Sequence, residues 1–109
     1  MALDIKVLAD AILKTVRPVL KKHWKDVKGY AETESRKMAE TLESIARLLA
    51  AGKIDQEQAT TLVEIQKNAM RTVLLTVEGI GLIAAQNAIN AAIDAVRTTV
   101  NGAVGLDLL

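Results

Sequence analysis

The connection at residues 52–58 constrains this chain more than any other feature of its sequence. Gly52 follows a helical segment and fits the left-handed position that ends a helix. Asp55 is a suitable N-cap for a new helix, and Gln58, three residues later, completes a capping-box pattern. One helix therefore ends and another begins within a few residues. This pattern predicts a tight reversal in an all-α chain.

The segment before this connection has the apolar spacing of a helix in two parts. Residues 3–28 place one apolar face opposite charged side chains, and residues 33–51 show a second such face. Pro18 should kink or restart the first helix, because it lacks a backbone N–H and crowds the preceding turn. Gly29 lies in a turn-like stretch and predicts the main break. We expect helices over about 3–28 and 33–51.

The segment after the connection shows no clear stop before residues 101–102. A helix over 56–101 would hold roughly 45 residues and extend nearly 70 Å, at about 1.5 Å per residue. Residues 102–109 would form a tail. The two arms have almost the same length, so Gly29 on one should lie level with Gly79 and Gly81 on the other.

These segments predict an all-α fold built as a long antiparallel helical hairpin of three helices, with the first arm broken near Gly29. The stretch around Gly79 and Gly81 has no capping residue and is too apolar for a solvated loop, which favours an unbroken second arm. The alternative is a compact monomeric four-helix bundle, in which both arms fold back at these glycines. In either case residues 1–109 form a single helical domain.

Residues 72–85 are apolar nearly all round the predicted helix. The polar stripe of this arm should continue through positions 75 and 82, and both are Leu. A helix that is apolar on every side must be buried on every side, and one neighbouring arm cannot cover it. The simplest cover is a second copy in a two-fold dimer that completes a helical bundle. The interface candidates on this arm are Val73, Leu74, Leu75, Val77, Ile80, Leu82, Ile83, Ala84, Ala88 and Ala91.

A membrane-associating or membrane-inserting hairpin is the alternative function. The uncharged run 79–93 is short for a spanning helix and contains Gln86, Asn87 and Asn90, which fit a protein interface better than lipid. The N-terminal third favours membrane association, because residues 1–30 carry seven basic and three acidic side chains. A basic patch there can contact an anionic surface, although such a patch is often only a solvated face. It consists of Lys21, Lys22, Lys25 and Lys28.

Glu78 is the single carboxylate inside the most apolar segment. Buried in the bundle, it would need a partner such as Lys25 or Lys28 on the other arm. Alternatively, it would lie on a dimer axis or at a solvated break beside Gly79. Burial would also perturb its ionisation, which makes Glu78 a candidate pH switch or buried ion.

The residues that catalysis usually needs are scarce. The chain has no cysteine and one histidine, His23, and no nucleophile pattern or glycine-rich phosphate loop can be assembled. Glu40, Glu43 and Glu64 lack the Glu-x-x-His pairs of dimetal helical bundles. We therefore expect no enzyme activity, no cofactor and no metal site.

The charge balance and the first residues bear on partners and location. A net charge of +1 argues against a nucleic-acid partner. The first residues lack the pattern of a signal peptide, so we expect a cytoplasmic protein, or a membrane-peripheral one under the alternative. The expected function is a non-enzymatic structural or protein-interaction module, either a homo-oligomer, a dimer in its simplest form, or a component of a larger assembly.

Overall fold

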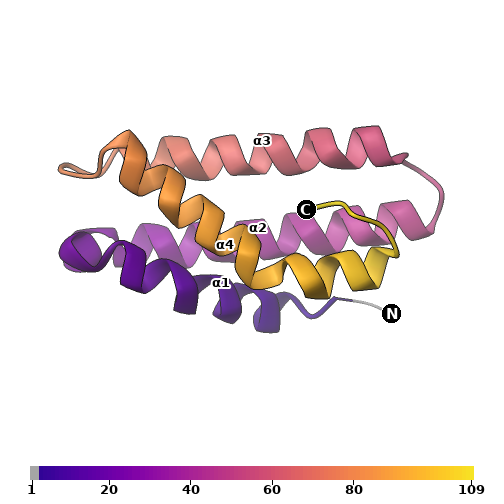
Figure 1. Ribbon diagram of the computed structural model, residues 1–109, viewed down its shortest axis with the longest axis horizontal. Coiled ribbons are helices and arrows are strands. Elements are labelled where there is room, and N and C mark those ends of the chain that lie inside the picture. Colours follow the sequence, from indigo (N-terminus) through magenta and orange to yellow (C-terminus); the bar gives the residue numbers. More distant parts are fainter. Residues whose placement is uncertain (1–2) are drawn as a thin grey trace.

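The computed structural model describes residues 3–109, and the first two residues of the predicted domain lie outside that range. Within it the chain forms four α-helices and one short 3-10 helix, which confirms the all-α prediction. The order is α1 (Ile5–Val19), η1 (Lys21–His23), α2 (Trp24–Ala50), α3 (Gln56–Leu75) and α4 (Leu82–Val104). Successive α-helices run in opposite directions along the long axis of the molecule (Figure 1).

The connection between α2 and α3 has the predicted capping. Gly52 adopts a φ of 67°, in the left-handed region that favours glycine. The Gln58 backbone N–H donates to Asp55 Oδ1 at 2.8 Å, and the Asp55 N–H donates to Gln58 Oε1 at 2.9 Å. This capping box confirms the predicted reversal.

The break in the first arm lies at residues 20–23, so the predicted helix over 3–28 and the break near Gly29 are wrong. α2 runs through Gly29 because its buried stripe continues on both sides, with Val27 and Ala31 in the core. Burying that stripe outweighs the cost of glycine in a helix, about 1 kcal/mol. Pro18 lies in the last turn of α1. It has no backbone N–H to donate, and the helix ends one residue later, before the turn into η1.

The second arm is also broken, so the predicted single helix over 56–101 is wrong. The bundle measures 42 × 23 × 18 Å, far shorter than the predicted hairpin, and its four α-helices fit the compact alternative. The connecting loop is apolar because it is not solvated: Val77 and Ile80 are buried in the core. The Val77 N–H donates to Leu74 O at 3.2 Å and the Ile80 N–H to Val77 O at 3.1 Å.

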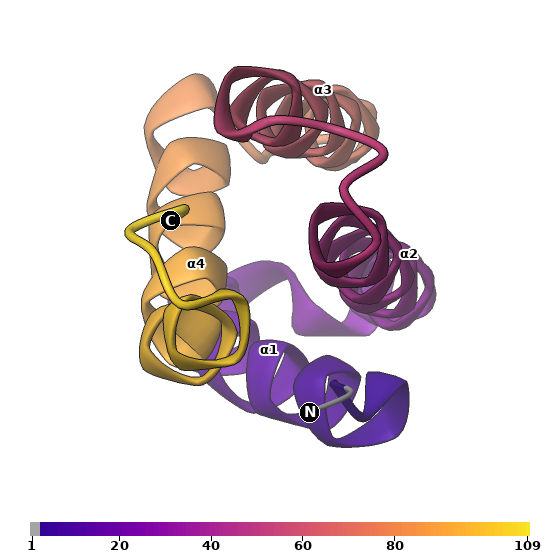
Figure 2. The ribbon, with the colours of Figure 1, turned by 90° about the vertical axis from the view of Figure 1, so that its right-hand side faces the viewer.

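α4 begins beside α3 and then crosses the bundle to lie along α1 (Figures 1 and 2). Three fully buried small residues, Ala85, Ala88 and Ala92, line its inner face. Small side chains on a buried helix face permit a close approach of neighbouring backbones, which suits this crossing.

The chain after α4 folds back toward α3 (Figure 2). Gly105 ends the helix at a φ of 73°, so the tail begins later than the predicted residue 102. The Asn101 side chain accepts hydrogen bonds from the N–H groups of Leu108 at 3.0 Å and Leu109 at 2.9 Å. Leu108 is buried in the same core as the helices. The tail therefore closes the space that α4 leaves as it diverges from α3.

Candidate functional site

The ten interface candidates divide between core and surface. The chain itself covers most of them, because the second arm folds back on the bundle. The buried ones are Leu74, Val77, Ile80 and Ala88, the partly buried ones are Val73, Ala84 and Ala91, and the exposed ones are Leu75, Leu82 and Ile83. The exposed fractions of the last three are 41%, 62% and 79%. These three are the most exposed of the ten candidates.

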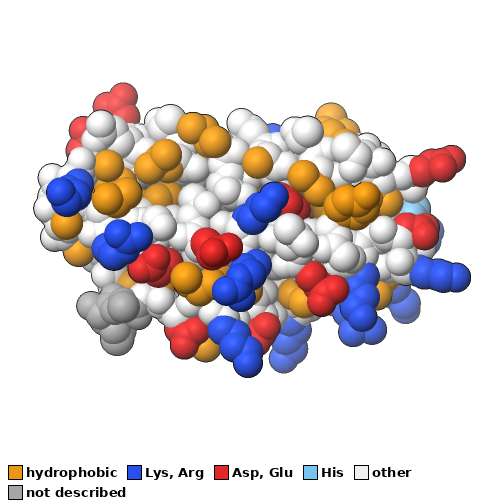
Figure 3. Space-filling model, turned by 180° about the vertical axis from the view of Figure 1, so that it is seen from behind, with side chains coloured by type: hydrophobic (Ala, Val, Ile, Leu, Met, Phe, Trp, Pro, Cys, Tyr) orange, Lys and Arg blue, Asp and Glu red, His pale blue; other side chains and the backbone are white. Residues whose placement is uncertain are grey.

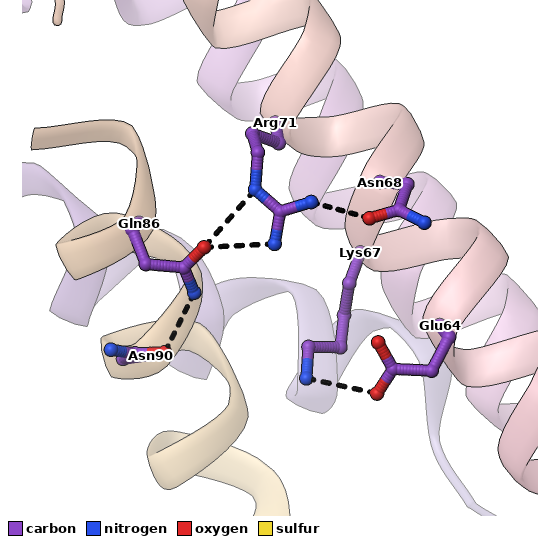
Figure 4. Close-up of polar contacts among 6 residues, drawn as sticks. All are labelled: Glu64, Lys67, Asn68, Arg71, Gln86 and Asn90. Carbon is purple, nitrogen blue, oxygen red and sulfur yellow. Dashed lines mark hydrogen bonds and ion pairs between the residues drawn. The ribbon is translucent and has the colours of Figure 1, made fainter. Parts of the chain in front are cut away.

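The three exposed residues lie at the corner where α3 turns into α4. Arg71 of α3 donates from Nε and Nη2 to Gln86 Oε1 of α4, at 3.0 and 2.8 Å (Figure 4). Leu75 lies one helical turn beyond Arg71 on the same face of α3, toward the loop. Leu82 lies one turn before Gln86 on the same face of α4. Ile83 follows Leu82. We call Leu75, Leu82 and Ile83 the apolar corner.

Polar side chains border the apolar corner on the side away from the loop. Arg71 also donates to Asn68, and Gln86 donates from Nε2 to Asn90 Oδ1 at 3.0 Å (Figure 4). These contacts join α3 to α4 and hold the guanidinium in place. The arrangement is an apolar centre with a polar border, as in many protein interfaces.

The loop between α3 and α4 lies against the turn between α1 and α2. Gly79 has a φ of 91°, and a Cβ added there would stand 2.9 Å from His23 Cε1. His23 is therefore a packing residue at this junction. The apolar corner and the start of α2 consequently belong to the same end of the molecule, which we call the loop end.

The predicted basic patch is exposed at the loop end. Lys21 and Lys22 lie in η1, and Lys25 and Lys28 lie in the first turns of α2. In the described part of the chain, the ion pairs involve other cations: Arg36, Lys37, Arg47, Lys67 and Arg97. The space-filling view shows Lys and Arg side chains gathered along the lower right of the molecule, toward the loop end (Figure 3).

A groove of about 370 Å³ opens between α1 and α2 beside this patch. The Arg17 guanidinium lies over the Trp24 ring, 5.5 Å from its centroid. The groove is lined by Asp10, Leu13, Lys14, Arg17, Trp24 and Lys28. It combines three cations, one carboxylate and a partly exposed indole. The basic patch predicted from residues 21–28 does not include Lys14 and Arg17, because these two residues belong to α1.

Glu78 is exposed in the α3–α4 loop beside Gly79, which agrees with a solvated break at that glycine. It makes no ion pair with any described residue, so the buried pair with Lys25 or Lys28 is wrong. The buried carboxylate is Glu34 of α2, whose Oε2 lies 3.3 Å from Lys37 Nζ. The signal for it was present in the sequence. Glu34 falls on the helical face that also carries Val27 and Met38, and that face is buried.

The other carboxylates singled out in the sequence form ordinary pairs on their own helices. Glu40 lies near Arg36, Glu43 near Arg47 and Glu64 near Lys67, at 3.9, 3.3 and 3.2 Å. No group of three or more His, Cys, Asp or Glu residues in 3–109 has the arrangement of a metal site. None of the helices in this range is long and apolar enough to cross a bilayer.

The chain matches no known protein family, and it has no significant match among curated proteins or solved structures. The function is therefore inferred from the surface of the molecule itself.

Proposed function

We propose that this chain is a non-enzymatic protein-interaction module that self-associates through the apolar corner. The observation that supports the proposal is the exposure of three large apolar side chains, Leu75, Leu82 and Ile83, at the adjoining ends of α3 and α4. Apolar side chains gathered on a soluble surface and bordered by polar residues commonly mark an interaction site. The other seven candidates in this segment are at least partly covered by the chain's own core.

A two-fold arrangement suits this corner. In an isologous contact the same patch serves both copies, so each apolar corner would cover the other. Arg71 and Gln86 are already bonded to one another at the border, so these two hydrogen bonds are kept when water leaves. A patch of three large side chains is small against a stable interface, which buries about 1,600 Å² in total. We therefore infer a weak, concentration-dependent dimer.

The test is sedimentation equilibrium over a range of protein concentrations. The Leu82→Glu/Ile83→Glu double variant should sediment as a monomer, because dimerisation would bury its carboxylates without partners. The wild-type chain should shift toward dimer as its concentration rises. The matched control is Val7→Glu/Ile65→Glu, which alters two residues of similar exposure, 60% and 59%, away from the corner. This control should dimerise as the wild-type chain does.

Two results would contradict the proposal. A wild-type chain that stays monomeric at every concentration would exclude self-association. A corner variant that dimerises as strongly as the wild-type chain would place the interface elsewhere. Far-ultraviolet circular dichroism of both variants checks that the helices are retained, since all four substituted side chains are exposed.

A separate observation supports a second candidate function, peripheral attachment to an anionic membrane from the cytoplasmic side. Every cation from Lys6 to Lys28 lacks an ion pair in the described structure, while most cations in the remainder of the chain have one. Unpaired basic side chains gathered on one part of a surface attract anionic headgroups.

A further inference from the structure

The groove around Trp24 combines features that the sequence separates. Lys14 and Arg17 come from α1, while Trp24 and Lys28 come from the first turns of α2. The reversal at residues 20–23 brings the two pairs together across one opening. Lys14 and Arg17 thus add two cations to the positive charge of the lysine patch at 21–28.

We propose that this groove is the docking surface for an anionic lipid bilayer, with Lys14, Arg17 and Lys28 contacting headgroup phosphates and carboxylates and Trp24 lying at the interface. This proposal rests on the second candidate function and assigns its site. The apolar corner takes no part in it.

Charge complementarity identifies the occupant as an anionic surface. The groove lining holds three cations and a single carboxylate, Asp10, and Lys21 and Lys25, close by in the sequence, are exposed. None of these five cations is neutralised by an ion pair within residues 3–109. Their charge is thus available to a partner, and each basic residue near an anionic bilayer strengthens binding roughly fivefold.

Trp24 distinguishes a bilayer from other anionic partners. An indole ring has an apolar body and one N–H, and tryptophan is enriched at the headgroup level of membranes for that reason. Single-stranded nucleic acid instead stacks its bases on several aromatic side chains, and this chain has one Trp, one Tyr and no Phe.

The form of the surface also favours a bilayer over a folded protein. The lysine side chains stand on long flexible stems, which satisfy a diffuse sheet of negative charge without a fixed register. A protein partner would need an apolar anchor to fill a pocket at the centre of the contact. In this groove the Trp24 indole is partly covered by the Arg17 guanidinium, so it offers no open apolar pocket for such an anchor.

The experiment is flotation of the full chain with vesicles, read together with its own fluorescence. Vesicles of phosphatidylcholine alone are compared with vesicles containing one third phosphatidylserine, at low and at high salt. Trp24 is the single tryptophan, so its emission reports on the groove without a label. We expect flotation with the anionic vesicles at low salt, accompanied by a blue shift of the emission. Both effects should disappear at high salt, where charges are screened within a few ångströms.

The variant that tests the site is Lys14→Gln/Arg17→Gln/Lys28→Gln. Its affinity for the anionic vesicles should fall about a hundredfold, because three basic residues at roughly fivefold each are removed. The matched control, Arg36→Gln/Lys53→Gln/Arg97→Gln, removes the same net charge at exposed positions outside the groove. It should lose much less affinity and keep the blue shift.

The outcomes separate the site from the function. If the wild-type chain does not float with anionic vesicles at low salt, both the second function and this site are excluded. If the wild-type chain floats but the two triple variants lose affinity equally, or Trp24 emission does not change, the groove is not the docking surface. Salt-resistant flotation with neutral vesicles would implicate the apolar corner instead. A Leu82→Gln/Ile83→Gln variant should float as the wild-type chain does, since it leaves the groove intact and the net charge unchanged.

Discussion

Gly79, in the α3–α4 loop, lies against His23, in the turn between α1 and α2. Its positive φ of 91° disfavours any residue with a Cβ, and the His23 ring occupies the space where that atom would lie. Gly81, two residues away, has a φ of −86° and nothing within 4 Å of an added Cβ. Two glycines that look equivalent in the sequence therefore have different requirements.

We expect Gly79→Ala to lower the free energy of unfolding by about 1–3 kcal/mol, because it combines backbone strain with a steric contact. Gly81→Ala should change it by less than about 0.5 kcal/mol, as an exposed substitution without strain. Urea denaturation followed by circular dichroism measures both values. Equal stability of the two variants would contradict this account of the loop.

The two glutamates show what residue-level reasoning from sequence can and cannot establish. Glu34 is identifiable as buried because its position on a regular helical face follows from the spacing alone. The exposure of Glu78 depends on a loop that the local pattern offered only as an alternative. Within a helix, the helical period determines whether a side chain faces the core or the solvent. At a break between helices, the tertiary fold determines it.

At the scale of elements, α2 is continuous through Gly29 although glycine is a poor helix former. An added Cβ at Gly29 would meet nothing within 4 Å, and its backbone is helical. The residue is thus a helix-interior glycine that neither a turn nor close packing requires.

We expect Gly29→Ala to raise the free energy of unfolding by about 0.5–1 kcal/mol, because alanine loses less backbone entropy in a helix. Thermal and urea denaturation measure the change. A destabilised variant would instead indicate that the chain breaks at residue 29, as the sequence pattern suggested.

The sequence predicts the helix type, the α2–α3 connection and most of the buried faces, since capping residues and helical spacing are local signals. Pro18, another local signal, predicts a kink or restart next to the break at residues 20–23. The connection between α3 and α4 is not predictable in this way. The loop after Leu75 contains apolar residues that local rules assign to a helix, and it forms because Val77 and Ile80 gain burial against the bundle. That gain exists only once the other helices are in place.

The candidate site is predicted in part for the same reason. The interruption of the polar stripe at Leu75 and Leu82 makes both residues interface candidates, and both are exposed in the single chain. The reversal between α3 and α4 brings Leu75 and Leu82 to the same corner. The reversal between α1 and α2 brings Lys14 and Arg17 into one groove with Trp24. Sequence spacing cannot supply contacts of that kind.

At the scale of the whole molecule, the tail completes the bundle. α4 diverges from α3 toward its C-terminal end, and Leu108 enters the core from the tail (Figure 2). Asn101 holds the tail through two accepted hydrogen bonds.

We expect Asn101→Ala to lower the free energy of unfolding by about 1–2 kcal/mol, since two amide hydrogen bonds lose their acceptor. Hydrogen exchange of the Leu108 and Leu109 amides should become faster than in the wild-type chain. Asn87→Ala is the control, because Asn87 is exposed in the same helix and holds no part of the tail. Unchanged exchange at the tail in the Asn101 variant would show that Leu108 burial alone holds it.

The crossing of α4 has a consequence for how the molecule opens. The first half of α3 lies beside α2, whereas α4 has diverged from it toward α1 (Figures 1 and 2). α1 packs against both α2 and α4. Cooperative units with less packing open at lower free energy than the global core. The start of α3 and the tail therefore form the least stable unit. Because this unit lies away from the loop end, it can open locally while both proposed binding surfaces stay folded.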